Sequence, residues 1–429
     1  MRSIPSIAIL FVLVIAICAV PAARSFTPSI PKAVNQSYVL VGGQNGTWFK
    51  NGQAPRLVRV DLSNYSVTSL NPVPGDGTVW SGGWNGSQWL VSGWGIDKGA
   101  NGSNPYIYLY NGQNQVVAGS TDQFQAEETW RGGDIFATSY NGRQWLLSGL
   151  GSGNLSQYGV ANHMSLSLFD GNRFTDLSSS IPDQTDEILY ANSWNGKYWL
   201  IGGGYGDDGI LLSFDGKQVV DLTDPIAEAV PNFSSIQSIA WNGSYWLIGG
   251  VNFLAGYDGN QFTDLTNKLY DVLSRGTSCC SSVNAIAWNG EEWMIGGGTP
   301  VAQTTNSHAW LAEYSGNGFT DLTSEVSPFS DLYPDSSILS IAASQGNWVI
   351  GGYLNGHGWL LQYSGGWLTN LSDLVSDFTY VNWVGAPSVQ SFGQTTVPPP
   401  PYNPWPEPNI LAEQGVSWAL ETSWMNFAF

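Results

Sequence analysis

Short apolar segments alternate with Asn-Gly pairs along most of the chain. One such unit is WNGSYWLIGG, Trp241 to Gly250, and close variants begin at Trp84, Tyr140, Trp194 and Trp288. An Asn-Gly pair between two apolar runs predicts a β-hairpin, because both turn residues can take positive φ. A two-residue turn at Asn242-Gly243 would place Trp241 opposite Ser244, with Trp246 as its diagonal neighbour on the same face. The recurring aromatic pair is therefore predicted to be a packing element rather than a ligand platform.

A second pattern follows each of these units. It is GYDGNQFTDLT in one copy and LFDGNRFTDLS in another, and its Asp-Gly or Ser-Gly pair predicts a second hairpin. Each unit then supplies four strands, A to D, which in one copy are SIAW, YWLIGG, LAGY and FTDLT. Periods near 40–50 residues indicate a propeller or a solenoid. The strand B position recurs every 47 to 56 residues, at Val39, Trp89, Trp145, Trp199, Trp246, Trp293 and Trp348.

The two ends of the repeat region favour a closed ring over an open solenoid. The first unit begins with strand B at Tyr38, whereas DFTYVNWVG, residues 377–385, resembles a lone strand A. In that alignment Trp383 and Gly385 take the places of Trp241 and Gly243. A C-terminal strand that completes the N-terminal blade would remove the exposed sheet edges. The prediction is an all-β, seven-bladed β-propeller with four-stranded blades over residues 35–386.

The glycine pairs at the ends of the B strands, such as Gly249-Gly250, are expected where backbones crowd together or bulge. The apolar run that ends in Gly-Gly, followed by a strand such as LVRVDLSNYSVTSLNPV (residues 57–73), resembles a kelch-type repeat. The FDG…F halves are similar to the repeats of two-component-regulator propellers. The resemblance covers about residues 38–385 and implies the propeller fold.

The segments outside the repeat suggest export. Residues 1–24 contain Arg2, an apolar run and the small residues PAARS, which is typical of a cleaved signal peptide; an uncleaved anchor is the alternative, and membrane attachment is expected only through one of these. Residues 387–408 form a proline-rich linker, and 409–429 form a tail. Candidate glycosylation sequons agree with a secreted or cell-surface protein; they lie at Asn35, Asn45, Asn64, Asn85, Asn101, Asn154, Asn232, Asn242 and Asn370.

Charge narrows the choice of partner. Lys and Arg number 14 against 33 Asp and Glu, which gives a net charge of −19. Such a surface repels phosphate backbones, so nucleic acid is not an expected partner.

One face of the disc is predicted to carry the function. The A–B and C–D turns share one face and are short, whereas the B–C and D–A connections, GGYGDDG among them, are expected to be long and variable on the other face. Variable loops on a rigid scaffold commonly carry binding sites. The candidate residues on this long-loop face are Arg131, His163, Asp207, Asp208, Arg275, Cys279, Cys280, His308 and His357.

The chemistry of these candidates leaves several interpretations open. The three histidines share a position at the start of strand C on different blades, too far apart for one metal ion, so no metal and no cofactor are expected. Adjacent Cys279 and Cys280 form a vicinal disulfide in one interpretation and free or intermolecular thiols in the other. The loop carboxylates, densest at Asp207-Asp208, are solvated charges unless they act on a glycoside or bind calcium, and YGDDG lacks the spacing of a calcium loop.

The sequence thus favours an extracellular propeller that binds a glycan, a protein or a cell-envelope component through the long-loop face. The alternatives are a secreted propeller glycoside hydrolase or lyase and a structural cell-envelope protein. Catalysis is less expected than binding, since the sequence contains no phosphate loop, zinc-finger spacing or Ser-His-Asp motif.

Overall fold

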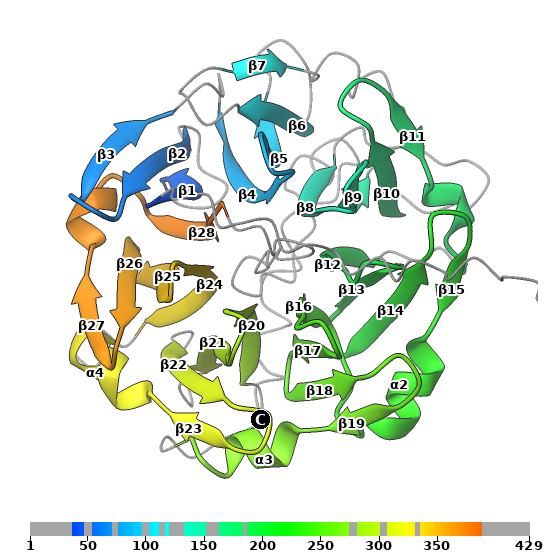
Figure 1. The fold of residues 1–429 in the computed structure, drawn as a ribbon. Helices are drawn as coiled ribbons and strands as arrows, with labels where there is room; N and C mark the ends of the chain where they lie inside the picture. Colours follow the sequence, from blue (N-terminus) through cyan, green and yellow to red (C-terminus); the bar gives the residue numbers. More distant parts are fainter. Residues whose placement is uncertain are drawn as a thin grey trace, which may run out of the picture. The chain divides into compact units, whose positions relative to one another are not determined.

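Seven four-stranded antiparallel sheets form a ring in the computed structural model of the chain (Figure 1). The structure describes residues 37–46, 54–70, 76–96, 103–110, 116–119, 133–151, 163–182, 187–273, 281–300, 307–330 and 335–387. We number the blades 1 to 7 in chain order and name the strands of each A to D from the inside outwards. The predicted fold class is confirmed.

The first three blades have the following strands. Blade 1 contains β28 (Tyr380–Gly385), β1 (Tyr38–Asn45), β2 (Ala54–Asp61) and β3 (Ser66–Ser69). Blade 2 contains β4 (Asp76–Trp84), β5 (Trp89–Ile96), β6 (Ser103–Tyr110) and β7 (Val116–Gly119). Blade 3 contains β8 (Asp134–Tyr140), β9 (Trp145–Gly151), β10 (His163–Phe169) and β11 (Phe174–Asp176).

The other four blades follow the same order. Blade 4 contains β12 (Ile188–Trp194), β13 (Trp199–Tyr205), β14 (Asp208–Phe214) and β15 (Val219–Asp221). Blade 5 contains β16 (Ile236–Trp241), β17 (Trp246–Gly250), β18 (Phe253–Tyr257) and β19 (Phe262–Asp264). Blade 6 contains β20 (Ser282–Trp288), β21 (Trp293–Pro300), β22 (Ser307–Tyr314) and β23 (Phe319–Asp321). Blade 7 contains β24 (Ser336–Ser344), β25 (Asn347–Leu354), β26 (His357–Ser364) and β27 (Trp367–Asn370).

Short helices follow the D strands of five blades. They are η2 (Ser178–Ser180), α2 (Thr223–Ala229), α3 (Thr266–Tyr270), α4 (Thr323–Ser330) and η3 (Ser372–Val375). The Asp-Leu-Thr of FTDLT makes this transition in blade 5: Asp264 Oδ1 accepts the Thr266 N–H at 2.9 Å, and Thr266 Oγ1 accepts the Leu254 N–H at 3.1 Å. No helix within these described ranges is both long and apolar enough to cross a membrane.

Neighbouring blades make contact through the glycine pairs. A Cβ on Gly249 would collide with Val283 of blade 6, and one on Gly250 would collide with the Ser235 carbonyl. Strand A bulges at this level, because Ile236 pairs with Gly250 but Ser238 pairs with Gly249. The first glycine therefore leaves room for a side chain of the next blade, and the second leaves room for the bulged backbone of strand A in its own sheet, as expected from the sequence.

The ring closes inside blade 1, as predicted. Strand β28 pairs antiparallel with β1, so the sheet order is β28-β1-β2-β3. The Ser340 hydroxyl of blade 7 accepts the Val384 N–H at 3.0 Å, and the Ser238 hydroxyl of blade 5 accepts the Ile286 N–H of blade 6 at 3.1 Å. The closing strand thus repeats a contact between A strands found elsewhere in the ring.

The predicted alignment of Trp383 with Trp241 is wrong. Trp383 pairs with Gly42, whereas Trp241 pairs with Trp246, so Trp383 occupies the position of Ser238. Its buried ring fills space above Gly82 of blade 2 and makes an edge contact with Trp89 at 5.5 Å between centroids. The aromatic side chain therefore seals the joint between blades 1 and 2.

The predicted two-residue hairpin turn is also wrong. Trp241 pairs directly with Trp246, and the Asn242 N–H donates to the Tyr245 carbonyl at 3.2 Å, so the loop has four residues. Gly243 has positive φ, whereas Asn242 does not. The Asn242 side chain instead accepts the Ser244 and Tyr245 N–H groups, each at 2.9 Å, which favours the longer turn. The Trp241 and Trp246 rings lie 4.3 Å apart between centroids, in agreement with the predicted packing role.

We expect Gly249→Ala to destabilise the protein by about 1–3 kcal/mol, because the added methyl group must displace Val283. Gly256→Ala is the matched control in the same blade, where the nearest atom would lie 3.7 Å from the new Cβ. Chemical denaturation measures both; equal stability of the two variants would contradict the packing role of the glycine.

Trp383→Ala should cost about 3–5 kcal/mol, because it empties a fully packed site at the closure joint. Trp367→Ala provides the comparison, since the Trp367 side chain is 80% exposed and its loss leaves no cavity. Thermal unfolding of both variants tests whether the Trp383 ring holds the closing strand.

Candidate binding face

Most described turns on the face that carries the A–B and C–D connections share one hydrogen-bonding pattern, whereas blade 7 has a two-residue A–B turn at Gln345-Gly346. In each A–B turn of blades 2 to 6 an asparagine side chain accepts turn N–H groups. The C–D turns of blades 3 to 5 use Asp170, Asp215 and Asp258 in the same way, and the turn N–H groups lower the pKa of these carboxyl groups. These polar residues therefore have a structural task, and we call this side the turn face.

The opposite face carries the B–C and D–A connections, and these differ from blade to blade. Residues 152–162 connect β9 to β10, and 301–306 connect β21 to β22, whereas β13 and β14 are joined only by Gly206 and Asp207. The prediction that GGYGDDG forms a long loop is therefore wrong, because Tyr205 pairs with Asp208. Residues 251–252 and 355–356 form equally short turns in blades 5 and 7. The face is variable, as predicted, but it is not uniformly long.

The sequence-predicted candidates do not converge on one point. Asp207 and Asp208 are exposed on the short β13–β14 turn. His163 begins β10 and is fully buried, His308 is the second residue of β22, and His357 is exposed at the start of β26. Their equivalent positions at the start of strand C confirm the predicted alignment and place them on three different blades. In the part of the chain described, no three His, Cys, Asp or Glu side chains are grouped to hold a metal ion.

Several candidates lie outside the described residues. They are Arg131, Arg275, Cys279 and Cys280, together with the sequon residues Asn35, Asn101 and Asn154. The disulfide at Cys279-Cys280 remains a prediction. Among the described sequons, Asn64, Asn85, Asn242 and Asn370 each accept a local backbone N–H through Oδ1, so these residues already shape turns.

The bulge residues of the A strands form a ring of side chains near the axis, and no pattern in the sequence predicted it. In blades 2 to 4 this position is aromatic: the Trp80–Phe136 and Phe136–Tyr190 centroids are each 5.3 Å apart. In blades 6 and 1 it is an amide, and Asn284 and Asn382 each donate to the next blade, at 3.0 Å to the Ile338 carbonyl and 2.9 Å to Thr78 Oγ1. In blade 7 it is Leu339, so polar and apolar residues are mixed outside the aromatic arc of blades 2 to 4.

Gln237 is the bulge residue of blade 5, between Tyr190 of blade 4 and Asn284 of blade 6. It is 2% exposed, and its Nε2 donates to Ser235 Oγ at 3.0 Å. Its buried Oε1 accepts no hydrogen bond from the residues that the structure describes. A buried acceptor without a donor costs about 1–3 kcal/mol, which a ligand donor could recover.

A titratable group also lies at this face between blades 6 and 7. Asp335, just before β24, is hydrogen-bonded to the Tyr353 hydroxyl and to the Ser307 N–H. Burial raises the pKa of Asp335, and burial together with the nearby carboxylate raises the pKa of Tyr353. The ring of Tyr380 packs edge-on against Tyr353 at 5.1 Å between centroids. One carboxyl group hydrogen-bonded to two neighbours in this way anchors the D–A connection and provides no second acid for acid–base catalysis.

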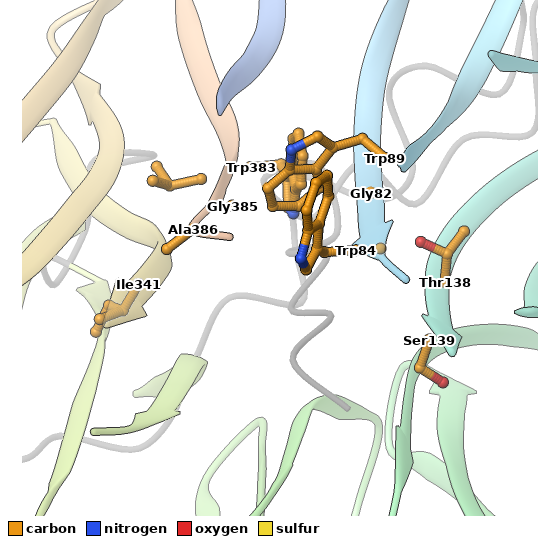
Figure 2. Close-up of a pocket in the computed structure, with 11 residues that line it drawn as sticks. Gly82, Trp84, Trp89, Thr138, Ser139, Ile341, Trp383, Gly385 and Ala386 are labelled. Carbon is orange, nitrogen blue, oxygen red and sulfur yellow. The ribbon is translucent and has the colours of Figure 1, made fainter. Parts of the chain in front are cut away.

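A small axial pocket opens at the other end, close to the turn face (Figure 2). Its lining includes Trp84, Trp89 and Trp383 on one side and Thr138 and Ser139 across from them. The pocket has a volume of about 20 Å³, which is room for roughly one water molecule. None of its lining residues is titratable, so it offers no acid or base.

Two carboxyl groups share a proton at the turn face of blade 6. Glu313 on β22 is hydrogen-bonded to Glu292 in the A–B turn. Burial, followed by this hydrogen bond and the charge of Glu292, raises the pKa of Glu313 to about 7. The folded protein therefore binds a proton that the unfolded chain releases near pH 4.5, and stability falls as the pH rises from about 4.5 to 7.

Glu313→Gln should consequently raise the melting temperature at pH 8 and have little effect at pH 4, since the amide keeps the hydrogen bond without the charge. Glu291→Gln, an exposed neighbour in the same turn, is the control. A gain for Glu313→Gln that is equal at both pH values would contradict the shared proton.

Comparisons with known proteins support the fold alone. No family profile matches the sequence, and no curated protein matches it. Among solved structures, the chain resembles the GH74 xyloglucanase from Xanthomonas campestris, with a TM-score of 0.50 and 10% identity over 76% of this chain. The match covers 53% of that chain, so it spans about half the length of the xyloglucanase. The β-propeller domain of the Trilobed protease from Pyrococcus furiosus matches with a TM-score of 0.46 and 9% identity, over 78% of this chain and 92% of that one.

Proposed function

We propose that this seven-bladed propeller is an extracellular binding protein that recognises a glycan, a protein or a cell-envelope component through the face of the B–C and D–A connections. The observation that carries the proposal is the difference between the two faces. Most described turns on the turn face repeat one hydrogen-bonding pattern, whereas the connections opposite vary in length from two residues to the segment 152–162. Variation confined to one side of a rigid scaffold is the usual arrangement of a binding surface.

The axial side of blades 4 and 5 is the best-supported contact region on that face. Tyr205 is 47% exposed beside Asp207 and Asp208. It also lies near Tyr190 of the aromatic arc, whose pKa is raised first by burial and then by the nearby Tyr205 hydroxyl. The unsatisfied Oε1 of Gln237 belongs to the next blade. Aromatic surface next to a few polar groups suits an uncharged or amphipathic ligand better than an anion.

The test is binding to an array of purified cell-wall polysaccharides and immobilised cell-surface extract. The triple variant Tyr205→Ala, Asp207→Ala, Asp208→Ala should lower affinity by about tenfold, the loss expected for an aromatic contact in the binding surface. The matched control, Lys197→Ala with Lys217→Ala, alters exposed turn-face residues of the same blade. Equal binding by all three proteins would place the site elsewhere, and release of reducing sugars from the array would favour the hydrolase alternative.

A further inference from the structure

Exposed apolar side chains gather where blade 7 meets blade 1. Six large hydrophobic residues are exposed in the part of the chain that the structure describes, and three of them, Tyr65, Val67 and Trp367, belong to the outer strands and turns of these two blades. Strands β3 and β27 are the outermost strands of these two neighbouring blades (Figure 1). Trp367 is 80% exposed, which is unusual for the largest apolar side chain.

The strand register places these residues on facing sides of this junction. Leu360 and Val60 pack in the same buried cluster, so each points from its blade towards the other. Gln362 follows Leu360 by two positions and Trp367 is paired with Ser364, which puts both on the side that faces blade 1. Val67 is paired with Val60 and therefore faces blade 7. The junction thus has buried aliphatic side chains beneath exposed aromatic ones from both blades, and we call this strip of exposed residues the groove.

Tyr65 is held in the groove at a conformational cost. Its φ is +56°, in the left-handed region that favours glycine, and it lies in a C–D hairpin that is two residues longer than that of blade 5. Its hydroxyl donates to Gln362 Oε1 of blade 7 at 3.3 Å. A bulky residue in a backbone conformation that favours glycine costs about 1–3 kcal/mol and is commonly retained for a functional reason.

Trp367 also departs from the repeat. Tyr363 pairs with Leu368 in blade 7 as Tyr257 pairs with Phe262 in blade 5, so Trp367 corresponds to Gln261. By the same alignment the equivalent residues of blades 3, 4 and 6 are Arg173, Gln218 and Gly318. The aromatic side chain is therefore specific to this groove and is not part of the general blade plan.

The chain itself leads to this groove. Strand β28 ends at Gly385 on the turn face, where it pairs with Leu40 near the start of β1. The turn between β2 and β3, which contains Tyr65, lies on the same face, because Asp61 at the end of β2 pairs with both Tyr38 and Ser66. The rim is three strand spacings from strand A, about 14 Å at 4.8 Å each. Residues 388–394 can extend by about 23 Å at 3.3 Å per residue, which is enough to reach it.

The sequence that follows has the composition that such a groove accepts. Residues 395–408 are TTVPPPPYNPWPEP. Proline-rich segments favour the polyproline II conformation, and aromatic grooves with a few hydrogen-bonding side chains bind it at low entropic cost. All the groove residues named are uncharged, as is this segment except for Glu407. Because the segment is tethered, its effective concentration is high, so weak contacts suffice.

We propose that the groove formed by Tyr65, Val67, Gln362 and Trp367 binds the proline-rich segment 395–408 of its own chain, which fixes the C-terminal segment to the turn face. The proposal is independent of the binding site on the opposite face, since no residue is shared between them.

Site-specific photocrosslinking in the full chain tests this. The photoreactive residue p-benzoylphenylalanine replaces Thr369, which is exposed, pairs with Gln362 and leaves Trp367 in place. Cross-links identified by mass spectrometry should map to residues 395–408 of the same molecule, as shown by mixing isotopically light and heavy chains. The same probe at Thr263, the equivalent rim position of blade 5, is the control and should give no such product.

Substitutions in the groove and in the proline-rich segment test whether these residues make the contact. Trp367→Ala and Tyr65→Gly should each lower the yield of this cross-link about tenfold, and thermal unfolding checks that both remain folded. Replacing Pro398 to Pro401 by alanine should lower the yield similarly, and excess synthetic peptide of residues 395–408 should compete. Cross-links that join two copies, that map elsewhere, or that persist in the Trp367→Ala variant would each overturn the proposal.

Discussion

Contact between neighbouring innermost hairpins is the constraint on which the whole ring depends. A glycine on strand B leaves room for an aliphatic side chain of the next blade, as Gly249 does for Val283. Each blade must present the same surface to the next, so the ring closes only if β28 imitates the other A strands. It does so through Val381, which packs against Gly351, and through the Val384 N–H, which donates to Ser340.

The unequal faces follow from this arrangement. Strands that diverge from a crowded axis must be joined tightly at one end, and the asparagine and aspartate side chains make those turns by accepting backbone N–H groups. The connections at the other end cross between blades or between the middle strands and are free of that requirement. Sequence can vary there without loss of packing, and the strand bulges bring aromatic and amide side chains to the same end.

The junction of blades 7 and 1 departs from the repeat on the outside of the ring. Blade 1 is assembled from both ends of the propeller, and its C–D hairpin is longer than that of blade 5 and contains Tyr65 at positive φ. The exposed Trp367 is the second irregularity at the same junction. Irregularities that coincide in space, although they are 302 positions apart in sequence, are better explained by a shared contact than by drift.

The sequence determined the blade count, the four-strand unit and the closing strand, because turn residues and β-forming apolar runs act locally and repeat seven times. It misplaced Trp383 by three positions and shortened the hairpin turn, since the register depends on the asparagine side chain and on packing against the next blade. The repeat period likewise could not predict the ring of bulge residues, the Asp335–Tyr353 contact or the groove at Trp367. Those features depend on which side chains meet across blades, and only the closed ring decides that.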